Sequence, residues 1–118
     1  MDLYTDLGIG ESIFIVPGQI AKISTGISVE IPLGLYGRVA PRSGLGVAGI
    51  GILAGVIDND YRGEIAVLAT AHAQPRQINH GDRVAQLILE RYASLAIVEA
   101  EELSDTTRGA GGFGSTGR

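Results

Sequence analysis

The chain has 118 residues, a net charge of −4 at pH 7 and no cysteine. It is short enough to form a single domain, and it has no means of forming disulfides, thiolate nucleophiles or cysteine-ligated zinc sites. The acidic balance disfavours non-specific binding to nucleic acid or anionic membranes, and the two histidines, His72 and His80, lie in no metal-ligand pattern.

Strand patterns recur along most of the chain, whereas helix patterns are scarce. Period-two alternation and flanking glycine or proline residues predict strands at 12–16, 26–31, 35–40, 51–57, 64–70, 83–90 and 95–100. The turn-rich loop at 58–63 predicts that two of these strands form a β-hairpin. Many short strands without helical crossovers predict an all-β sandwich or jelly roll.

No segment has the composition of a targeting signal or a membrane span. The longest uncharged run, 43–57, contains five glycines and is shorter than the roughly 20 apolar residues that a spanning helix needs. No N-terminal signal peptide is visible. We therefore expect an intracellular, cytoplasmic protein (or a nuclear one, in a eukaryotic or viral setting) that binds neither membrane nor nucleic acid.

The stretch APRSGLG, residues 40–46, ends a predicted strand with Pro41 and continues with Arg42, Ser43 and Gly44. A Ser-Gly step exposes backbone N–H groups to which a phosphate can come close, and Arg42 adds a charged fork. The alternative is an ordinary polar turn. Eight of the nine basic residues are arginine and Lys22 is the only lysine, which suits either phosphate binding or surface ion pairs.

The stretch GVIDNDYRGE, residues 55–64, places Asp58 directly after an apolar strand and Tyr61 in the same loop. A carboxylate at the end of a buried strand is held firmly enough to orient or deprotonate a water molecule. The alternative is a hairpin turn in which Asp58 and Asn59 cap their own backbone.

The stretch GDRVAQLIL, residues 81–89, places Gln86 among apolar neighbours on one face of a predicted strand. A half-buried amide needs hydrogen-bond partners, which either a ligand or a neighbouring strand would supply. We expect Asp82 and Arg83 to form a structural pair.

The chain ends in an acidic segment, 99–105, followed by RGAGGFGSTG at 108–117. A floppy tail is one interpretation of this glycine-rich stretch. The other is a flap that orders on a flat, anionic ligand, because Phe113 can stack on a base and Arg108 suits a terminal phosphate.

Taken in order, the stretches DLY (2–4), APRSGLG, GVIDNDYRGE, GDRVAQLIL and RGAGGFGSTG resemble the five motifs of the homotrimeric dUTPases, the deoxyuridine 5'-triphosphate nucleotidohydrolases. The intervening stretch TGISVEIPLGLYGRVAP (25–41) also resembles family sequence. The resemblance covers essentially the whole chain, although family members usually begin well before the first motif.

The resemblance implies a β jelly roll that assembles as a homotrimer with three active sites at subunit interfaces. Residues 1–104 would form the jelly-roll domain, and residues 105–118 a flexible C-terminal flap of the same domain that completes the site of another subunit. The reaction would cleave dUTP into dUMP and pyrophosphate by water attack at the α-phosphorus. Such an activity limits uracil incorporation into DNA and supplies dUMP for thymidylate synthesis.

The resemblance also implies roles for individual residues around the nucleoside. Asp58 would orient and activate the attacking water, and Tyr61 would lie against the deoxyribose and leave no room for a 2′-hydroxyl. The backbone of the strand containing Gly55 and Ile57 would hydrogen-bond the edge of the uracil. Leu53 stands where glycine is frequent in the family, and the segment 44–57 is one residue shorter than in common members.

Further residues would contact the triphosphate and its Mg²⁺ ion. Ser43 and Gly44 would hold the phosphate chain, Arg42 would support that loop, and Gln86 would contact the α-phosphate. The substrate itself would carry the Mg²⁺, which Asp2 would touch only through water.

The C-terminal flap would complete this set. Arg108 would meet the γ-phosphate, Phe113 would cap the uracil, and Gly114, Ser115 and Thr116 would close over the phosphates. Two alternatives remain at this point: a dCTP deaminase-type enzyme of the same fold, and a catalytically weak, dUTPase-like protein that binds nucleotides in a regulatory role.

Overall fold

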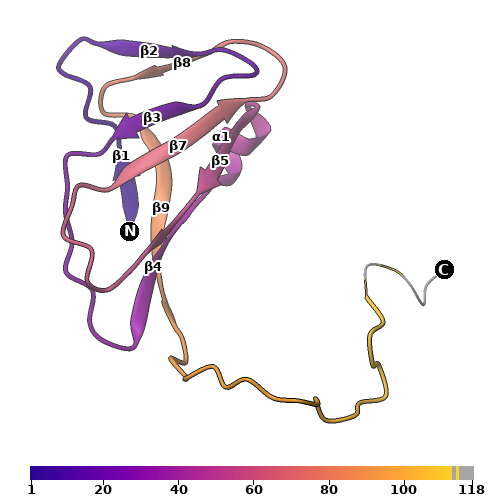
Figure 1. Ribbon diagram of the computed structural model, residues 1–118. Helices are drawn as coiled ribbons and strands as arrows, with labels where there is room; N and C mark the ends of the chain where they lie inside the picture. Colours follow the sequence, from indigo (N-terminus) through magenta and orange to yellow (C-terminus); the bar gives the residue numbers. More distant parts are fainter. Residues whose placement is uncertain (113, 115–118) are drawn as a thin grey trace.

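A computed structural model describes residues 1–112 and 114, and it is built almost entirely of β-strands (Figure 1). No helix among these residues is long and apolar enough to cross a membrane. The strands and the helix are β1 (Asp2–Tyr4), β2 (Ser12–Ile15), β3 (Ala21–Ser24), β4 (Leu35–Ala40), α1 (Ser43–Val47), β5 (Ile50–Ala54), β6 (Val56–Ile57), β7 (Ala66–Ala71), β8 (Arg76–Asn79) and β9 (Arg83–Arg91).

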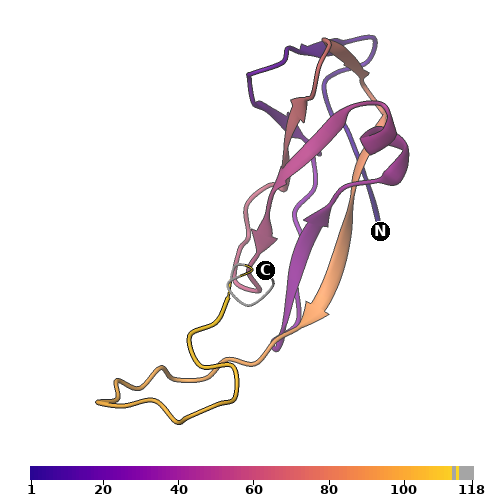
Figure 2. The ribbon, with the colours of Figure 1, turned by 90° about the vertical axis from the view of Figure 1, so that its right-hand side faces the viewer.

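The strands form three antiparallel sheets. The largest has the order β1-β9-β4-β6, a second has the order β3-β7-β5, and β2 pairs with β8. Figure 2, turned by 90°, shows β4 and β9 running beside the sheet that contains β5 and β7. This architecture confirms the predicted all-β jelly-roll class.

The core lies between the two larger sheets, where alternate residues of each strand point inward. In β7, Val67, Ala69 and Ala71 are buried while the residues between them are half-buried, the alternation expected of a strand with one covered face. Val84 and Leu87 of β9 meet them from the other sheet. Fully burying an aliphatic side chain of this size stabilises the fold by about 1.5–3 kcal/mol, so this core holds the loops of the site in place.

Two predicted strands are absent from the structure. Residues 26–31 form no strand. Ile31 is buried, and the carbonyl of Ile27 accepts a hydrogen bond from the amide of Ile65 at 2.8 Å. Residues 95–100 leave the body of the molecule and are exposed throughout (Figure 1). Apolar residues recur in this segment, but no strand of the described residues lies beside it to complete a ladder.

Four elements were not predicted, and the first of them, β1, is only three residues long. β3 and β8 each contain a single fully buried apolar residue, Ile23 and Ile78, among polar or small ones, so neither presents a clear alternating pattern. α1 contains two glycines, which are poor helix formers. The short helix follows from its tertiary position between β4 and β5 rather than from its own propensity.

Candidate active site

The predicted hairpin of 51–57 and 64–70 is present, but its first arm is divided between two sheets. β5 pairs with β7 as far as Ala54, which lies opposite Leu68. After Gly55 the chain leaves β7 and continues as β6 along β4, where Ile57 lies opposite Gly37. The two arms of the hairpin therefore diverge, and the backbone edge of β6 that does not pair with β4 faces the gap between them.

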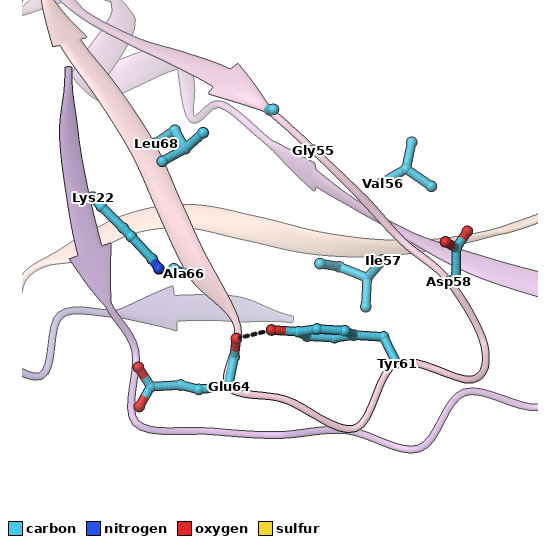
Figure 3. Close-up of a pocket in the computed structure, with 10 residues that line it drawn as sticks. Lys22, Gly55, Val56, Ile57, Asp58, Tyr61, Glu64, Ala66 and Leu68 are labelled. Carbon is cyan, nitrogen blue, oxygen red and sulfur yellow. Dashed lines mark hydrogen bonds between the residues drawn. The ribbon is translucent and has the colours of Figure 1, made fainter.

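This divergence opens a pocket of about 300 Å³ between the arms (Figure 3). Its lining is mostly apolar but includes several side chains that can form polar contacts. It is lined by Lys22, Ala54, Gly55, Val56, Ile57, Asp58, Tyr61, Glu64, Ala66 and Leu68. Gly55, Ile57, Asp58 and Tyr61, four of the residues predicted to form the site, thus surround one cavity.

Asp58 follows the last residue of β6 and its side chain is exposed at the rim of the pocket. The turn after it is closed by the backbone, since the amide of Tyr61 donates to the carbonyl of Asp58 at 3.1 Å. Among the described residues the Asp58 carboxylate has no hydrogen-bond or ion-pair partner. The Asp58 side chain therefore does not cap the turn, and its carboxylate is free to act on a ligand or a water molecule.

Tyr61 forms one wall of the pocket with its ring. Its hydroxyl donates to the carbonyl of Glu64 at 2.8 Å, which fixes the ring against the second arm of the hairpin (Figure 3). A Cβ at position 63 would lie 2.5 Å from that hydroxyl, so only glycine fits there. Gly63 thus allows the ring to fold back over its own loop and present a flat face to the cavity.

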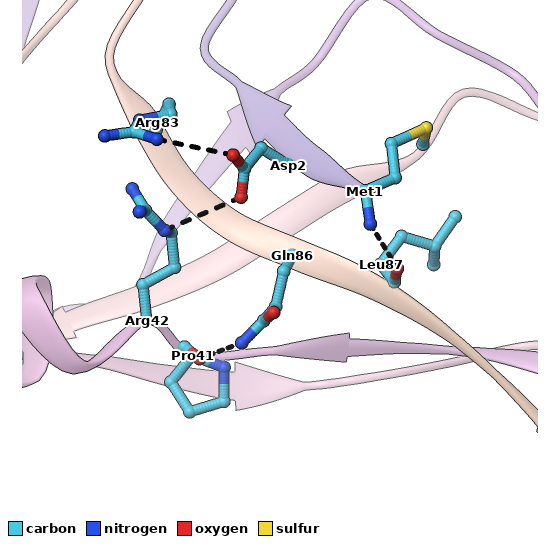
Figure 4. Close-up of polar contacts among 7 residues, drawn as sticks. All are labelled: Met1, Asp2, Pro41, Arg42, Arg83, Gln86 and Leu87. Atoms are coloured by element: carbon cyan, nitrogen blue, oxygen red, sulfur yellow. Dashed lines mark hydrogen bonds and ion pairs between the residues drawn. The ribbon is translucent and has the colours of Figure 1, made fainter.

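A second group of predicted residues lies where β1, β9 and the start of α1 meet (Figure 4). Asp2 lies between two guanidinium groups, 3.4 Å from Arg83 and 3.7 Å from Arg42. Gln86, opposite Asp2 in the β1–β9 ladder, donates through Nε2 to the carbonyl of Pro41 at 3.0 Å. The Gln86 amide therefore bonds to the residue that follows the neighbouring strand β4, which is close to the second alternative expected from the sequence.

The predicted pairing of Asp82 with Arg83 is wrong. The Asp82 carboxylate accepts a hydrogen bond from the amide of Asn79 at 2.8 Å and closes the turn before β9. Arg83, the next residue along the chain, extends instead to Asp2 on β1. Asp82 belongs to the turn and Arg83 to the strand that follows it, which accounts for the different partners.

Ser43 and Gly44 form the first turn of α1, with Arg42 as its N-cap residue in an extended conformation. No residue of this helix is buried. A Cβ at Gly44 would meet nothing within 4 Å, so packing within the chain does not demand glycine there. The open space beside this backbone leaves room for a ligand to approach it closely.

The hairpin pocket and the Asp2–Arg42–Gln86 group do not share a cavity within the described part of the chain. Arg108 lies in the segment beyond β9 that runs away from both, and its guanidinium donates to the carbonyl of Gly111 (Figure 1). Gly114 lies beyond it, with a φ of 77°. Phe113, Ser115 and Thr116, which were also predicted to contribute, lie outside the described residues.

One cluster next to Asp58 was missed by sequence reasoning. Tyr36 and Arg38 on β4 both donate to the carboxylate of Glu90 on β9, Arg38 at 2.7 Å. Accepting these bonds lowers the pKa of the Glu90 carboxyl, and the bond to Glu90 raises the pKa of the Tyr36 hydroxyl. Tyr36 and Asp58 share a second, smaller cavity of about 200 Å³. The sequence did contain a signal for this cluster, because Tyr36 and Arg38 are two residues apart and therefore share one face of a predicted strand.

The residues described here offer no group of three or more histidine, cysteine, aspartate or glutamate side chains that could hold a metal ion. Asp2, the predicted metal contact, already has its carboxylate between two arginines. A single paired carboxylate suits an indirect contact through water to a hydrated ion, and a strong Mg²⁺ ligand set would need further oxygen ligands from elsewhere.

Comparisons with known proteins agree with this arrangement. The family model named dUTPase matches residues 5–117. This chain belongs to the dUTPase family. The deoxyuridine 5'-triphosphate nucleotidohydrolase of Paramecium bursaria Chlorella virus 1 is 56% identical over 102 residues, which span 85% of this chain and 72% of the relative. The match covers four of the five stretches singled out in the sequence, and DLY at 2–4 lies just before it.

Solved structures agree in fold. The dUTPase of Staphylococcus bacteriophage 80alpha, determined with dUPNHPP, superposes with a TM-score of 0.86 at 25% identity and covers 99% of this chain and 85% of its own. A mutant dUTPase of phage phi11 of S. aureus, described with a structural Mg(II) ion, has a TM-score of 0.76 at 23% identity and covers 88% of this chain and 84% of its own. The second likeness shows the fold alone.

Proposed function

We propose that this chain hydrolyses dUTP to dUMP and pyrophosphate by water attack at the α-phosphorus. The observation that carries the proposal is the hairpin pocket, which gathers Gly55, Ile57, Asp58 and Tyr61 of one family motif around a single cavity. The names of the curated relatives support nucleotide hydrolysis over the deaminase and regulatory alternatives.

The pocket has the features that a deoxyuridine moiety needs. The unpaired edge of β6, from Gly55 to Ile57, offers backbone donors and acceptors to the edge of a uracil ring. The flat face of Tyr61 would lie against the deoxyribose. Because that ring is fixed by its bond to Glu64, it cannot move aside to admit a 2′-hydroxyl, which would favour deoxyribonucleotides over ribonucleotides.

Asp58 would act as the general base. It would accept a proton from a water molecule while the water oxygen forms a bond to the α-phosphorus and the bond from that phosphorus to the bridging oxygen breaks. The bonding pair leaves with pyrophosphate, and dUMP retains the new oxygen. The free, exposed carboxylate at the end of β6 supports this role, since a base engaged by a neighbouring donor would be a poorer proton acceptor.

The second group would hold the triphosphate. The backbone of Ser43 and Gly44 lies open beside α1, Arg42 adds a guanidinium, and Gln86 lies on the adjoining strand. Charge-assisted hydrogen bonds to phosphate oxygens are the interactions expected of such a set. A phosphate arriving here would compete with Asp2 for the Arg42 guanidinium, which is 3.7 Å from that carboxylate.

We infer that these two groups combine between copies of the chain in a homotrimer. None of the residues of the second group lines the hairpin pocket of the same chain, although a single dUTP must contact both groups. The segment beyond β9 supports the same inference, because it runs away from the body and exposes a series of large apolar side chains. They are Leu95, Ile97, Val98 and Leu103. A monomer in water would not leave such a series uncovered.

The flap at 105–118 would then reach the site of another copy. Arg108 would meet the γ-phosphate, and the proposed contacts of Phe113, Gly114, Ser115 and Thr116 would follow it along the nucleotide. A closing segment of this kind excludes bulk water from the reacting atoms.

Mg²⁺ would enter with the triphosphate and, when bound, would neutralise charge on the phosphate oxygens. On this chain the contribution of Asp2 would be to hold Arg42 and Arg83 in position and to accept hydrogen bonds from water around the ion. The protein's remaining task is to position the nucleotide and the attacking water.

The test is pyrophosphate release from dUTP, dTTP, dCTP and UTP, each measured with Mg²⁺ and with EDTA. Turnover of dUTP well above the other three, lost with EDTA, is the expected result. Equal turnover of UTP would contradict the role of Tyr61, and release of ammonia from dCTP would indicate the deaminase alternative.

A further inference from the structure

Lys22 lines the hairpin pocket although it lies outside every family motif identified in the sequence. It is on β3, opposite Leu68 of β7, and it is the only lysine in the chain. Its neighbour Ile23 is fully buried on the core side, so Lys22 points to the other face of the sheet. Figure 3 shows the side chain extending from β3 so that its ammonium ends beside Ala66.

The ammonium has no hydrogen bond or ion pair to any residue that the structure describes. Glu64, a carboxylate of the same pocket, accepts a hydrogen bond from the hydroxyl of Ser24 at 2.7 Å instead. A compact cation with three donors is thus held at the pocket wall with its hydrogen bonds available.

The order of residues along the pocket tells which part of a nucleotide Lys22 would meet. Asp58 and Tyr61 lie at the loop end, and the Tyr61 hydroxyl bonds to Glu64. From Glu64 the second arm runs past Ala66 to Leu68, a distance of about 13 Å at about 3.3 Å per residue. A sugar against Tyr61 therefore directs its base toward the end of the pocket where Lys22 and Leu68 lie, and its phosphates the opposite way.

Resting on the proposed function, we propose that Lys22 donates a hydrogen bond to the carbonyl oxygen at C4 of the uracil ring and selects uracil over cytosine. That carbonyl lies across the ring from the glycosidic nitrogen, in the direction of Lys22. A carbonyl oxygen has two lone pairs and can accept from the ammonium and from a backbone amide together. Cytosine carries an amino group at C4. This group is itself a hydrogen-bond donor, so it cannot accept a bond from the ammonium of Lys22.

Kinetics of two variants test the selectivity. Lys22→Met keeps the length of the side chain without its donors, and it is expected to lower kcat/KM for dUTP about tenfold, the scale of one charge-assisted hydrogen bond. The preference for dUTP over dCTP should narrow by a similar factor, while Lys22→Arg retains most of it. A proportional fall for both nucleotides in Lys22→Met would mean a structural role only and would overturn the proposal.

Chemical labelling tests the contact itself. Because the chain has one lysine, Lys22 and the amine of Met1 are its two amino groups for acetic anhydride, and peptide mass spectrometry separates their acetylation from that of tyrosine hydroxyls. The Met1 amine hydrogen-bonds to the carbonyl of Leu87, does not line the pocket and serves as an internal control. Saturating deoxyuridine, which carries no phosphate, is expected to slow acetylation of Lys22 several-fold and to leave Met1 unchanged.

Protection by pyrophosphate but not by deoxyuridine would place Lys22 at the phosphates and overturn the proposal, as would no protection by either. These failures are distinct from failure of the proposed function, which would be seen as absence of dUTP turnover by the unmodified protein.

Discussion

Ala54 and Ile57 are three residues apart in the chain but belong to different sheets. Ala54 pairs with Leu68 of β7, whereas Ile57 pairs with Gly37 of β4. The strand between them crosses from one sheet to the other, and the pocket that we assign to the nucleoside is the space left by this crossing. The position of Asp58, the next residue, depends on how closely β6 lies on β4.

Replacing Gly37 with alanine should therefore disturb both stability and catalysis. The added Cβ would lie 3.0 Å from Ile31 and Leu87 methyl groups and 3.3 Å from the Cβ of Ile57. Overpacking of this kind costs about 1–3 kcal/mol in the free energy of unfolding, which urea titration measures. We also expect kcat for dUTP to fall more than tenfold, since about 1 Å of misplacement can have that effect.

Gly46→Ala is the matched control, because a Cβ there meets nothing within 4 Å. Its stability should equal or slightly exceed that of the unmodified chain, since alanine favours the helix. Equal effects of the two substitutions would contradict the account of Gly37.

Asp58→Asn should lower kcat by about 10²–10⁴-fold, the range for removal of a general base. The side chain is exposed and makes no hydrogen bond or ion pair with the described residues, so the melting temperature should not change. Binding of dUPNHPP should persist within a few-fold, as isothermal titration calorimetry would measure. A variant that retains more than a tenth of the normal kcat would rule out Asp58 as the base.

Glu90 should make the stability of the fold depend on pH on the acid side. Its pKa is lowered in the folded chain by the bonds from Tyr36 and Arg38, so the folded state binds protons less readily than the unfolded state does. The resulting stabilisation is present above the ordinary pKa of 4.5 and is lost as the pH falls through the lower, folded value.

Urea titrations of Glu90→Gln and of the unmodified chain at several pH values measure this effect. The difference in unfolding free energy should be largest near neutral pH and should shrink below about pH 4.5. A difference that stays constant from pH 7 to pH 3 would show that the charge of Glu90 contributes nothing.

Mixed oligomers should reveal whether the site is shared between copies. Asp58→Asn and Arg108→Ala are each expected to be inactive. When the two are coexpressed with different affinity tags and the trimers that carry both tags are purified, about a third of the sites should regain both residues if these come from different copies. No regain of activity would indicate that Asp58 and Arg108 act within one chain.

Deleting residues 108–118 should abolish turnover and leave the oligomer intact. The deleted segment lies beyond all the strands, so the mass measured by light scattering should change only by the lost residues. Near-normal dUTP turnover by the shortened chain would contradict the role of the flap.

Local sequence patterns predicted those strands in which buried and exposed residues alternate strongly. The strand predicted at 35–40 is β4, residue for residue, and 83–90 falls within β9. Gly55, Asp58 and Tyr61 of the motif at 55–64, each predicted to belong to the site, line one cavity, and their roles stay predictions. In these segments the sequence period and the burial pattern coincide.

The remainder depends on contacts that no local pattern encodes. The division of the hairpin arises because β4 takes up residues 56–57 as a partner, and the sequence of 51–57 is equally apolar on both sides of Gly55. Lys22 reaches the pocket only because β3 pairs with β7. The apolar alternation at 95–100 predicted a strand, but none of the described residues pairs with it.

The most direct test of the central claim is single-turnover hydrolysis of dUTP in water enriched in ¹⁸O, with both products analysed by mass spectrometry. Attack of water on the α-phosphorus at Asp58 predicts one ¹⁸O atom in dUMP and none in pyrophosphate. Label in pyrophosphate, or formation of dUDP and inorganic phosphate, would show that water attacks another phosphorus and would contradict the account.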